Sequence, residues 1–330
     1  MTELSVLDLS PLLGAMTGAE AVRETIAMAQ IAEKLGFNRF WVAEHHSIPA
    51  FGGSAPEILI AAMSQVTSRI RLGSGGVMLP NHSPLKVAEQ FMVLEGLAPG
   101  RIDLGVGRAL GADMRTGSAL RSAGSEAFPQ YFALLNAWLL DSSGKEPFPE
   151  RHPASGIIAQ PRGPSHPDLF ILCTSVDSAT FAGKAGVGMV FAEFIAQTDA
   201  APAIAAYRAA FTPSPFRDKP WAGVGTSAFA ADTPEEAQRL DAPRQVWALS
   251  FLEGRQTSFP SLDAAHAKLA ALGPDPRLAE VSRRSIVGDG AQVRAALAAK
   301  AAHTGADELF IISYGPTRED RARSLELIKG

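Results

Sequence analysis

Two adjacent histidines, His45 and His46, follow Glu44 directly after an apolar run. Neighbouring histidines can indicate a metal site, but successive side chains of a strand point to opposite faces. Only one of the two would then face a shared ligand, and no HExxH or comparable ligand spacing accompanies them. We therefore expect no metal. The pattern favours one inward histidine with an acid–base or hydrogen-bonding role, and a structural histidine at a strand end is the alternative.

A glycine pair, Gly75 and Gly76, follows the next apolar run. Glycine permits backbone shapes that other residues resist. The pair would let a planar ligand approach the main chain closely. A simple β-bulge is the alternative interpretation.

An arginine and two serines form a candidate anion site. Arg108, Ser175 and Ser178 could bind a phosphate through a guanidinium fork, hydroxyls and the free N–H groups of a helix start. Routine helix capping is the alternative for the serines. The segment 288–290 is a second candidate because phosphate sites near the last two strands are frequent in barrels, but Asp289 would repel a phosphate.

Two further motif matches are weak. The segment Gly105–Gly111 resembles a dinucleotide fingerprint with one extra residue, but it does not follow the first strand-like run. It also lacks a convincing acidic partner about 20 residues further on. Ser83 and Lys86 match the S-x-x-K motif of serine acyl-enzymes, without the S-D-N and K-T-G motifs that accompany it. We assign no function to either match.

The candidate residues follow short strand-like runs that alternate with helical patterns. The pattern predicts eight strands, at 4–9, 39–43, 69–73, 101–106, 169–172, 188–191, 221–230 and 308–312. It predicts helices at 19–35, 56–66, 85–97, 130–140, 200–211, 233–252, 292–303 and 318–328, with a further short helix before 188.

This alternation predicts an α/β fold. A helical crossover makes neighbouring strands parallel, and eight such units close into a barrel. We therefore expect residues 1–330 to form one domain, a (β/α)8 barrel with insertions after strands four and seven. An open doubly wound sheet is the alternative, but it normally has fewer strands and a clearer domain break. Three irregular segments contain the residues beyond a minimal barrel: Gly111–Gly124, Asp141–Asp168 and Phe259–Arg284.

Composition restricts the partners. Among 330 residues, 30 are Lys or Arg and 34 are Asp or Glu, which gives a net charge of −4. Without a basic surplus or a long apolar run, we expect neither nucleic acid nor membrane as a partner. A single cysteine excludes an intramolecular disulfide framework and is compatible with the cytoplasm, where we expect the protein. The first ten residues show no basic segment followed by an apolar run, so we expect no secretory signal.

Several blocks resemble the bacterial luciferase-like flavin monooxygenase family, in particular its branch of natural-product oxygenases. They occur in order over most of the chain, at Trp41–His46, Arg71–Glu89, Pro99–Arg108, Ser285–Gly288 and Gly305–Leu309, followed by Arg323 and Ser324. The resemblance implies a barrel that uses reduced flavin mononucleotide (FMN) and O2. Such an enzyme would oxygenate a small organic substrate through a C4a-peroxyflavin.

The resemblance also implies roles for the candidate residues around the flavin. Arg108 and the backbone near Leu110 would bind the phosphate together with Ser175 and Ser178. Two residues depart from the pattern near this site, Cys173 and Thr174, where the branch usually has smaller or serine-like residues.

On the same resemblance, Gly75 and Gly76 would lie beside the isoalloxazine ring, where the family often has a non-proline cis peptide. His45 would hydrogen-bond or deprotonate near the flavin C4a atom. Gly111–Gly124 and Asp141–Asp168 would be lids that exclude water.

The resemblance further implies a separate flavin reductase and a homodimer formed through the helices after strands two and three. Two alternatives stay open. One is a hydride-transfer enzyme that uses the deazaflavin F420. The other is a flavin-binding barrel without turnover, against which His45 argues, because a mere binding pocket needs no base there.

Overall fold

The computed structural model describes residues 2–330. Within them, eight parallel strands form a closed barrel, and the predicted barrel is confirmed. Strand β1 pairs with β2 and β9, β9 pairs with β7, and β7 pairs with β6, which closes the ring. The barrel strands are β1 (Glu3–Asp8), β2 (Arg39–Val42), β3 (Arg71–Met78), β4 (Ile102–Gly107), β5 (Asp168–Cys173), β6 (Gly188–Ala192), β7 (Ala222–Ala231) and β9 (Glu308–Ile312).

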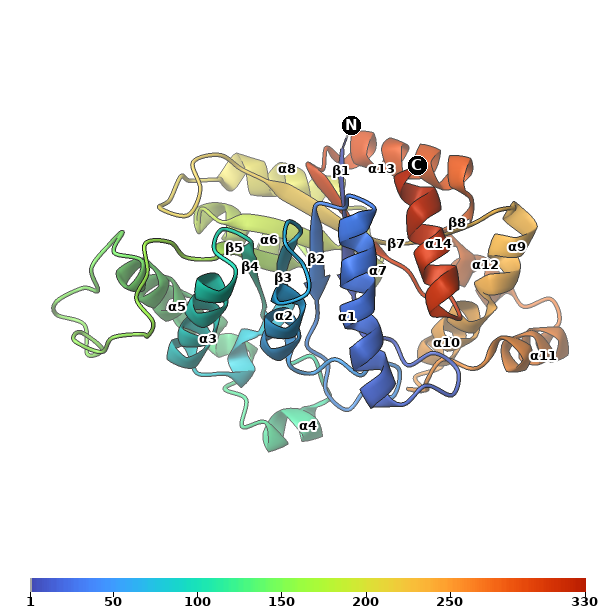
Figure 1. The fold of residues 1–330 in the computed structure, drawn as a ribbon, viewed down its shortest axis with the longest axis horizontal. Coiled ribbons are helices and arrows are strands. Elements are labelled where there is room, and N and C mark those ends of the chain that lie inside the picture. Colours follow the sequence, from blue (N-terminus) through green and yellow to red (C-terminus); the bar gives the residue numbers. More distant parts are fainter. Residues whose placement is uncertain (1) are drawn as a thin grey trace.

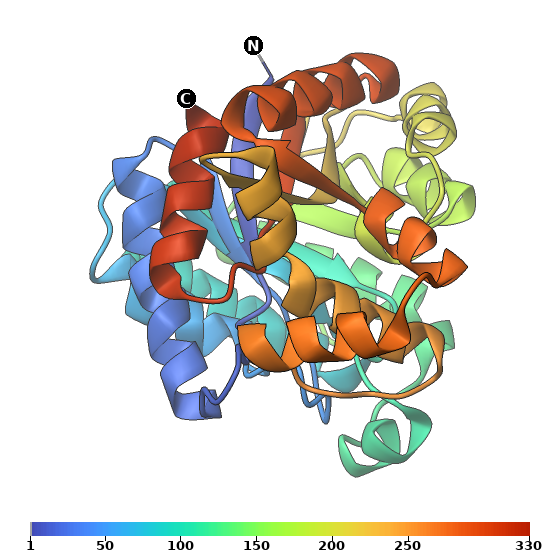
Figure 2. The same cartoon turned by 90° about the vertical axis from the view of Figure 1, so that its right-hand side faces the viewer.

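Helices surround the barrel, and their starts follow local sequence (Figures 1 and 2). Thr17 and Glu20 form a capping box at the first helix, and Asp289 and Gln292 form one at the penultimate helix. The surrounding helices are α1 (Gly18–Lys34), α2 (Pro56–Ser64), α3 (Pro84–Leu97), α5 (Phe128–Ser142), α6 (Val176–Lys184), α8 (Ala201–Ala210), α13 (Gly290–Thr304) and α14 (Arg318–Lys329). Within residues 2–330, every helix is too short or too polar to span a lipid bilayer.

Charged and aromatic side chains fill the end of the barrel where the strands begin. Arg39 donates to Asp103 at 2.7 Å and to Glu308 at 3.1 Å, and the indole of Trp41 donates to Asp103 at 2.9 Å. The Trp41 ring packs edge-on against Phe170 at 5.1 Å between centroids. Because this end is packed, space for a ligand remains at the carboxyl ends of the strands.

Strand β3 is longer than predicted. The strand expected from the sequence ended at Gly73, but β3 continues to Met78 and includes Gly75 and Gly76. Its register against β4 shifts between Gly75 and Val77, and the Gly75–Gly76 peptide bond is cis. Glycine is depleted in strands, which is why the pattern ended too early.

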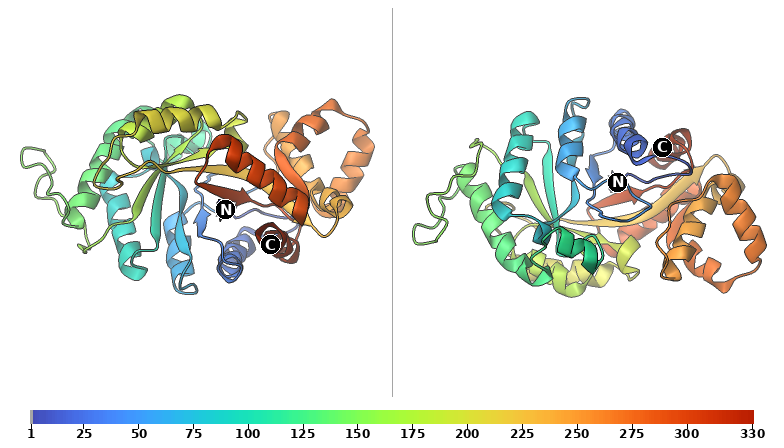
Figure 3. Two further views of the ribbon diagram at one scale, coloured as in Figure 1. Left: turned by 90° about the horizontal axis from the view of Figure 1, so that it is seen from above. Right: turned by 90° about the horizontal axis from the view of Figure 1, so that it is seen from below.

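The insertion after β7 differs most from the prediction. The single helix expected over 233–252 is two helices, α9 (Pro234–Leu240) and α10 (Ala242–Leu252), because Pro243 cannot continue the preceding helix. The segment 259–284, expected to be irregular, contains α11 (Leu262–Leu272) and α12 (Pro276–Arg283). An additional strand, β8 (Ser285–Asp289), pairs with the second half of β7 outside the ring. Figure 3 shows this insertion at one side of the barrel.

The insertion after β4 is partly helical. The short helix α4 (Met114–Ala119) lies within 111–124, beside the ends of the strands. The segment 143–167 has no helix or strand, as expected of a long loop. It lies on the α5 side of the barrel, away from the insertion after β7 (Figure 3). None of its residues lines the cavity at the barrel mouth, and a lid role for this segment stays a prediction.

Candidate active site

The carboxyl ends of the barrel strands enclose a cavity of about 350 Å³, here called the central cavity. Its volume falls in the range of about 300–1,000 Å³ that is usual for small-molecule sites. Most of its wall is apolar, with contributions from Leu7, Trp41, Leu172, Val190 and Phe310. The polar side chains in the wall are Glu44, His45, Arg108, Ser125, Thr174 and Ser178.

The structure brings four of the seven predicted site residues to this cavity: His45, Gly75, Arg108 and Ser178. The other three, Gly76, Leu110 and Ser175, do not line it. Each is adjacent in the chain to a residue that does, namely Gly75, Gly111 and Thr174, respectively.

His45 lies where the loop after β2 meets the cavity. Its backbone N–H donates to the carbonyl of Gly53 at 3.0 Å, and its ring packs against Phe51 at 5.0 Å between centroids. Its Nδ1 atom is buried without a hydrogen-bond partner. Burial lowers the pKa of His45 from 6.5 to about 4. At neutral pH the ring is therefore uncharged, and an unpaired ring nitrogen is available to a ligand.

Glu44 holds together the segments that follow β2 and β3. Its carboxylate accepts hydrogen bonds from His46 Nε2 at 2.8 Å, Asn81 Nδ2 at 3.1 Å, His82 Nε2 at 2.9 Å and the backbone N–H of Met78 at 2.8 Å. Burial alone would raise the pKa of the Glu44 carboxyl, but these hydrogen bonds outweigh burial, and the pKa lies below its ordinary value. The same hydrogen bond raises the pKa of His82. Sequence reasoning did not identify Glu44, although an acid beside two histidines was a signal.

His46 turns away from the cavity to reach Glu44, while His45 lines the cavity, as the strand alternation predicts. Among residues 2–330, no group of three or more histidine, cysteine or acidic side chains is placed to hold a metal ion.

Glycines form much of the remaining wall: Gly75, Gly107, Gly111 and Gly225. A Cβ at Gly75 would lie 2.8 Å from Leu7 Cδ1 and 3.1 Å from Trp41 Cε3, closer than ordinary contacts. Gly111 has φ of +61°, a conformation that L side chains rarely adopt. Packing at Gly75 and backbone conformation at Gly111 therefore favour glycine, and no side chain projects into the cavity at these positions.

The candidate phosphate site is only partly as predicted. Arg108 is exposed to the cavity and makes no ion pair or hydrogen bond within residues 2–330. Ser175 is the N-cap of α6, where it forms a capping box with Ser178. The helix-capping alternative therefore describes both serines, and Ser178 also lines the cavity. Thr174 and Ser125, which sequence reasoning did not select, also line this cavity.

Cys173 and Asp289, which the sequence analysis weighed in connection with phosphate binding, take no part in an anion site. Burial raises the pKa of the Cys173 thiol to about 12, so it stays a protonated, fully buried thiol. Asp289 accepts from the backbone N–H of Gln292 at 2.8 Å as the N-cap of α13, and its own carboxylate occupies that helix start.

A second cavity of about 250 Å³, here called the aromatic pocket, adjoins the central cavity. The two share Leu9, His45, Phe194 and Ile195, the last two from the short helix α7 (Glu193–Ala196). Much of its wall comes from α10 and neighbouring loops, including Phe51, Trp247, Phe251 and Tyr314. Sequence reasoning did not identify these residues.

Comparison with known families decides what this barrel is. The model of the family described as luciferase-like monooxygenase matches residues 2–308. The chain belongs to the luciferase-like monooxygenase family. Membership in this family makes it an oxidoreductase of the monooxygenase type.

Two similar proteins match most or all of the chain. An N-acetyl-S-alkylcysteine monooxygenase of Bacillus subtilis (strain 168) is 37% identical, and the match covers 82% of this chain and 80% of the relative's chain. The crystal structure of apo-MsnO8 is 37% identical, has a TM-score of 0.91 and covers 100% of this chain and 98% of its own.

More distant structures share the barrel alone. The oxygenating component of a 3,6-diketocamphane monooxygenase from Pseudomonas putida, solved with FMN, is 20% identical and covers 99% of this chain and 97% of its own at a TM-score of 0.70. An F420-dependent secondary alcohol dehydrogenase is 14% identical and covers 98% of this chain and 97% of its own at the same TM-score of 0.70. The fold therefore occurs with FMN and with F420.

Proposed function

We propose that this protein is a two-component monooxygenase that binds reduced FMN in the central cavity and oxygenates a small organic substrate with O2. One observation carries the proposal: the central cavity combines a neutral histidine that has an unpartnered buried nitrogen, an unpaired arginine and a glycine-rich wall. A separate flavin reductase would supply the reduced FMN.

The residues present fit this cofactor. The apolar and glycine wall suits the planar ring, since no side chain projects from Gly75, Gly107, Gly111 or Gly225. Arg108 is a free cation for the phosphate, and Ser178, Thr174 and Ser125 add hydroxyls in the same cavity. The unpaired Nδ1 of His45 can exchange a hydrogen bond with a ligand atom.

Reduced FMN, when bound, would supply electrons and react with O2. The chain's own residues would bind, orient and shield it. Arg108 would fix the phosphate, the apolar wall would exclude water, and neutral His45 would donate or accept one hydrogen bond at the reacting edge of the ring.

Arg108→Gln is expected to weaken FMN binding by about tenfold or more, because a hydrogen bond to a charged group contributes about 1.5–3 kcal/mol. Riboflavin, which lacks the phosphate, should bind the variant and the parent equally. Fluorescence titration measures both affinities. Arg115→Gln, an exposed arginine in α4 that does not line the cavity, is the control. Equal losses for FMN and riboflavin would contradict the phosphate role.

A stopped-flow experiment tests the proposed function. The protein is mixed with photoreduced FMN and then with O2, while absorbance is followed. A transient species distinct from reduced and oxidised FMN supports the proposal. Reoxidation at the rate of free FMN, with tight F420 binding, would instead indicate the hydride-transfer alternative. The same rate with tight FMN binding and no F420 binding would indicate a barrel that binds flavin without turnover.

We also propose a homodimer through α2 and α3. A groove between these helices is lined by Ile58, Ala61, Val93 and Leu94. Two of its apolar side chains are exposed, Ile58 to 67% and Val93 to 47%, and Leu97 at the end of α3 is 50% exposed. Ile58→Glu is expected to shift the protein from dimer to monomer in analytical ultracentrifugation. Met114→Glu, at an exposed site on α4, should leave the dimer intact, and a monomeric parent protein would refute this interface.

The remaining proposals are that residues 1–330 act as one domain and that the protein works in the cytoplasm. The buried, unpaired Cys173 is compatible with a reducing compartment.

A further inference from the structure

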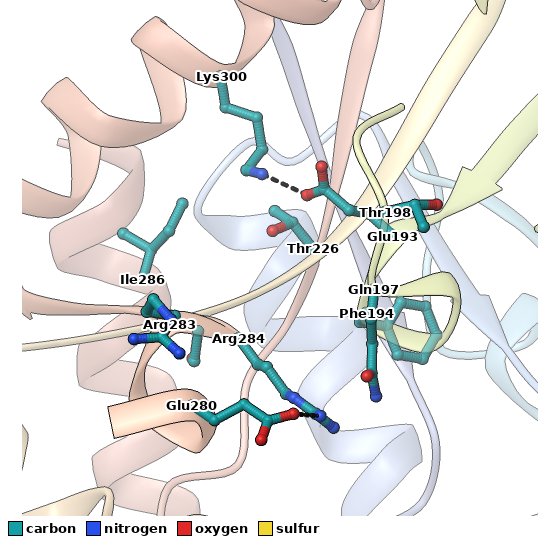
Figure 4. Close-up of a pocket in the computed structure, with 11 residues that line it drawn as sticks. Glu193, Phe194, Gln197, Thr198, Thr226, Glu280, Arg283, Arg284, Ile286 and Lys300 are labelled. Carbon is teal, nitrogen blue, oxygen red and sulfur yellow. Dashed lines mark hydrogen bonds and ion pairs between the residues drawn. The ribbon is translucent and has the colours of Figure 1, made fainter. Parts of the chain in front are cut away.

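A third cavity of about 340 Å³, here called the polar pocket, opens where the barrel wall divides. Strand β7 pairs with β6 up to Gly225 and with β8 from Ser227 onward, which leaves Thr226 between the two partners. Thr226 lines the polar pocket. In Figure 4 it lies between two ion pairs, Lys300 with Glu193 and Arg284 with Glu280.

The polar pocket adjoins the aromatic pocket. Phe194, Gln197 and Arg284 line both. The hydroxyls of Ser227 and Ser285 are 2.9 Å apart, and Ser227 lines the aromatic pocket whereas Ser285 lines the polar pocket. The two pockets therefore meet at the start of β8, and Arg284 stands at their junction.

The aromatic pocket contains two arginines, but only one is free to change partners. Arg244 forms a bidentate ion pair with Asp241 at 2.5 and 2.6 Å, and both side chains are buried. Arg284 pairs with Glu280, whose side chain is 48% exposed. Because the Glu280 carboxylate can return to water, Arg284, whose own side chain is 18% exposed, can exchange Glu280 for a ligand carboxylate at small cost.

The surrounding charges also favour an anion at this junction. The polar pocket contains three cations, Arg283, Arg284 and Lys300, and two carboxylates, Glu193 and Glu280. Arg283 makes no ion pair within residues 2–330. Gln197 lies across the pocket from Arg284 and can add a neutral hydrogen-bond donor (Figure 4).

Where the aromatic pocket borders the central cavity, it carries no charged side chain among residues 2–330. Leu9 and His45 connect it to the central cavity, where the flavin would lie. Between these ends, the wall is mainly aromatic and aliphatic, with Phe51, Trp247 and Tyr314 among its residues. A molecule that spans the pocket would have an apolar body, one end near the flavin and the other at Arg284.

We propose that the substrate is an amphipathic organic acid. Its apolar body would occupy the aromatic pocket, its carboxylate would pair with Arg284, and its reacting end would lie beside His45. The assignment of the reacting end rests on the proposed flavin monooxygenase function. The carboxylate site rests on the pocket alone.

The proposal is tested by titrating the full-length protein calorimetrically with ω-phenylalkanoates of increasing chain length and with their primary amides. Acid and amide have nearly the same shape and differ in charge. The acid of best-fitting length is expected to bind at least about tenfold more tightly than its amide, because hydrogen bonds to charged groups are the stronger ones. Arg284→Gln should abolish this preference.

Two control variants separate binding from structure. Arg284→Gln and Glu280→Gln break the same ion pair, so a merely structural role would move acid binding in the same direction in both variants. The proposal expects opposite directions, since Glu280→Gln removes a competing carboxylate and should tighten acid binding. Arg115→Gln, which removes an exposed cation of α4 that lines neither pocket, should leave the acid-to-amide ratio within about twofold of the parent's.

Equal affinities for acid and amide, the absence of binding by every acid in the series, or an acid preference that survives Arg284→Gln would each overturn the inference. FMN binding is measured on the same samples by visible absorbance. FMN binding without an acid preference would count against this inference alone. An intact acid preference without FMN binding would count against the proposed function and leave the carboxylate site in place.

Discussion

Glu44→Gln is expected to lower the melting temperature by roughly 5–10 °C and to weaken FMN binding by about tenfold. The carboxylate accepts from His46, Asn81, His82 and Met78, so an amide in its place would set one of its own N–H groups against these donors. Removing one partner of a buried ion pair costs about 3 kcal/mol. Binding weakens because Glu44 links the segments after β2 and β3 that carry His45 and Gly75.

The loss of thermal stability caused by Glu44→Gln is expected to depend on pH. The pKa of His82 is raised above its ordinary value of 6.5, so its contribution to stability is complete below pH 6.5 and is lost as pH rises through the folded-state pKa. The pKa of Glu44 is lowered from 4.5, so its contribution is lost as pH falls below that value. Thermal melts of Glu44→Gln and the parent protein should therefore differ most between about pH 4.5 and 6.5, and the difference should become smaller, without vanishing, as pH rises above this window.

Glu95→Gln is the matched control for Glu44→Gln. Glu95 is a buried carboxylate in α3 that accepts from the backbone N–H of Gly100 at 2.8 Å and from Ser165 Oγ at 2.7 Å, and it does not line the central cavity. Its replacement should lower the melting temperature and leave FMN affinity unchanged. Equal FMN affinity in Glu44→Gln and the parent protein would show that Glu44 is structural only.

The barrel could be predicted because its strands are short, apolar and separated by helices with strong start signals. The errors occurred where one local rule conflicted with tertiary structure. Glycines ended the predicted third strand, although β4 pairs with β3 on both sides of Gly76, at Gly75 and at Val77. In the insertion after β7, Pro243 marked a helix break, and Ser261 and Asp275 marked helix starts, but the prolines of this segment favoured an irregular interpretation.

The candidate site could be predicted in part, for a similar reason. Residues directly after strands, such as His45 and Arg108, meet at the barrel mouth because parallel strands end at the same edge. The Glu44 network joins residues about 34–38 positions apart, and no periodicity connects such residues before the strands are aligned. The aromatic pocket depends on how α10 packs over the mouth, which the sequence of α10 alone does not specify.

His45→Ala is expected to lower the oxygenation rate by about a hundredfold, because removing one positioned hydrogen-bonding group at a reacting centre costs about 10²–10³ in rate. FMN affinity should change by less than about threefold, since Arg108 and the cavity wall remain. The transient species seen in the stopped-flow experiment should decay faster. His45→Gln, which retains a hydrogen-bonding group without a titratable ring, should restore part of this lifetime. An unchanged lifetime in His45→Ala would remove His45 from the reaction.

The pH dependence of thermal stability provides a second, independent test of the environment of His45. Because burial lowers its folded-state pKa from 6.5 to about 4, the unfolded chain binds the proton more readily than the folded protein. The folded state therefore loses stability as pH falls from 6.5 towards 4, by up to about 3 kcal/mol. In thermal melts, His45→Gln should lose less stability over this range than the parent, whereas His303→Gln, at an exposed histidine on α13, should follow the parent. The pH profiles of activity for the parent and for His45→Gln should have the same shape near pH 6.5. An inflection near pH 6.5 in the parent that is absent from His45→Gln would mean that His45 reacts as a cation and not as the neutral ring inferred from its burial.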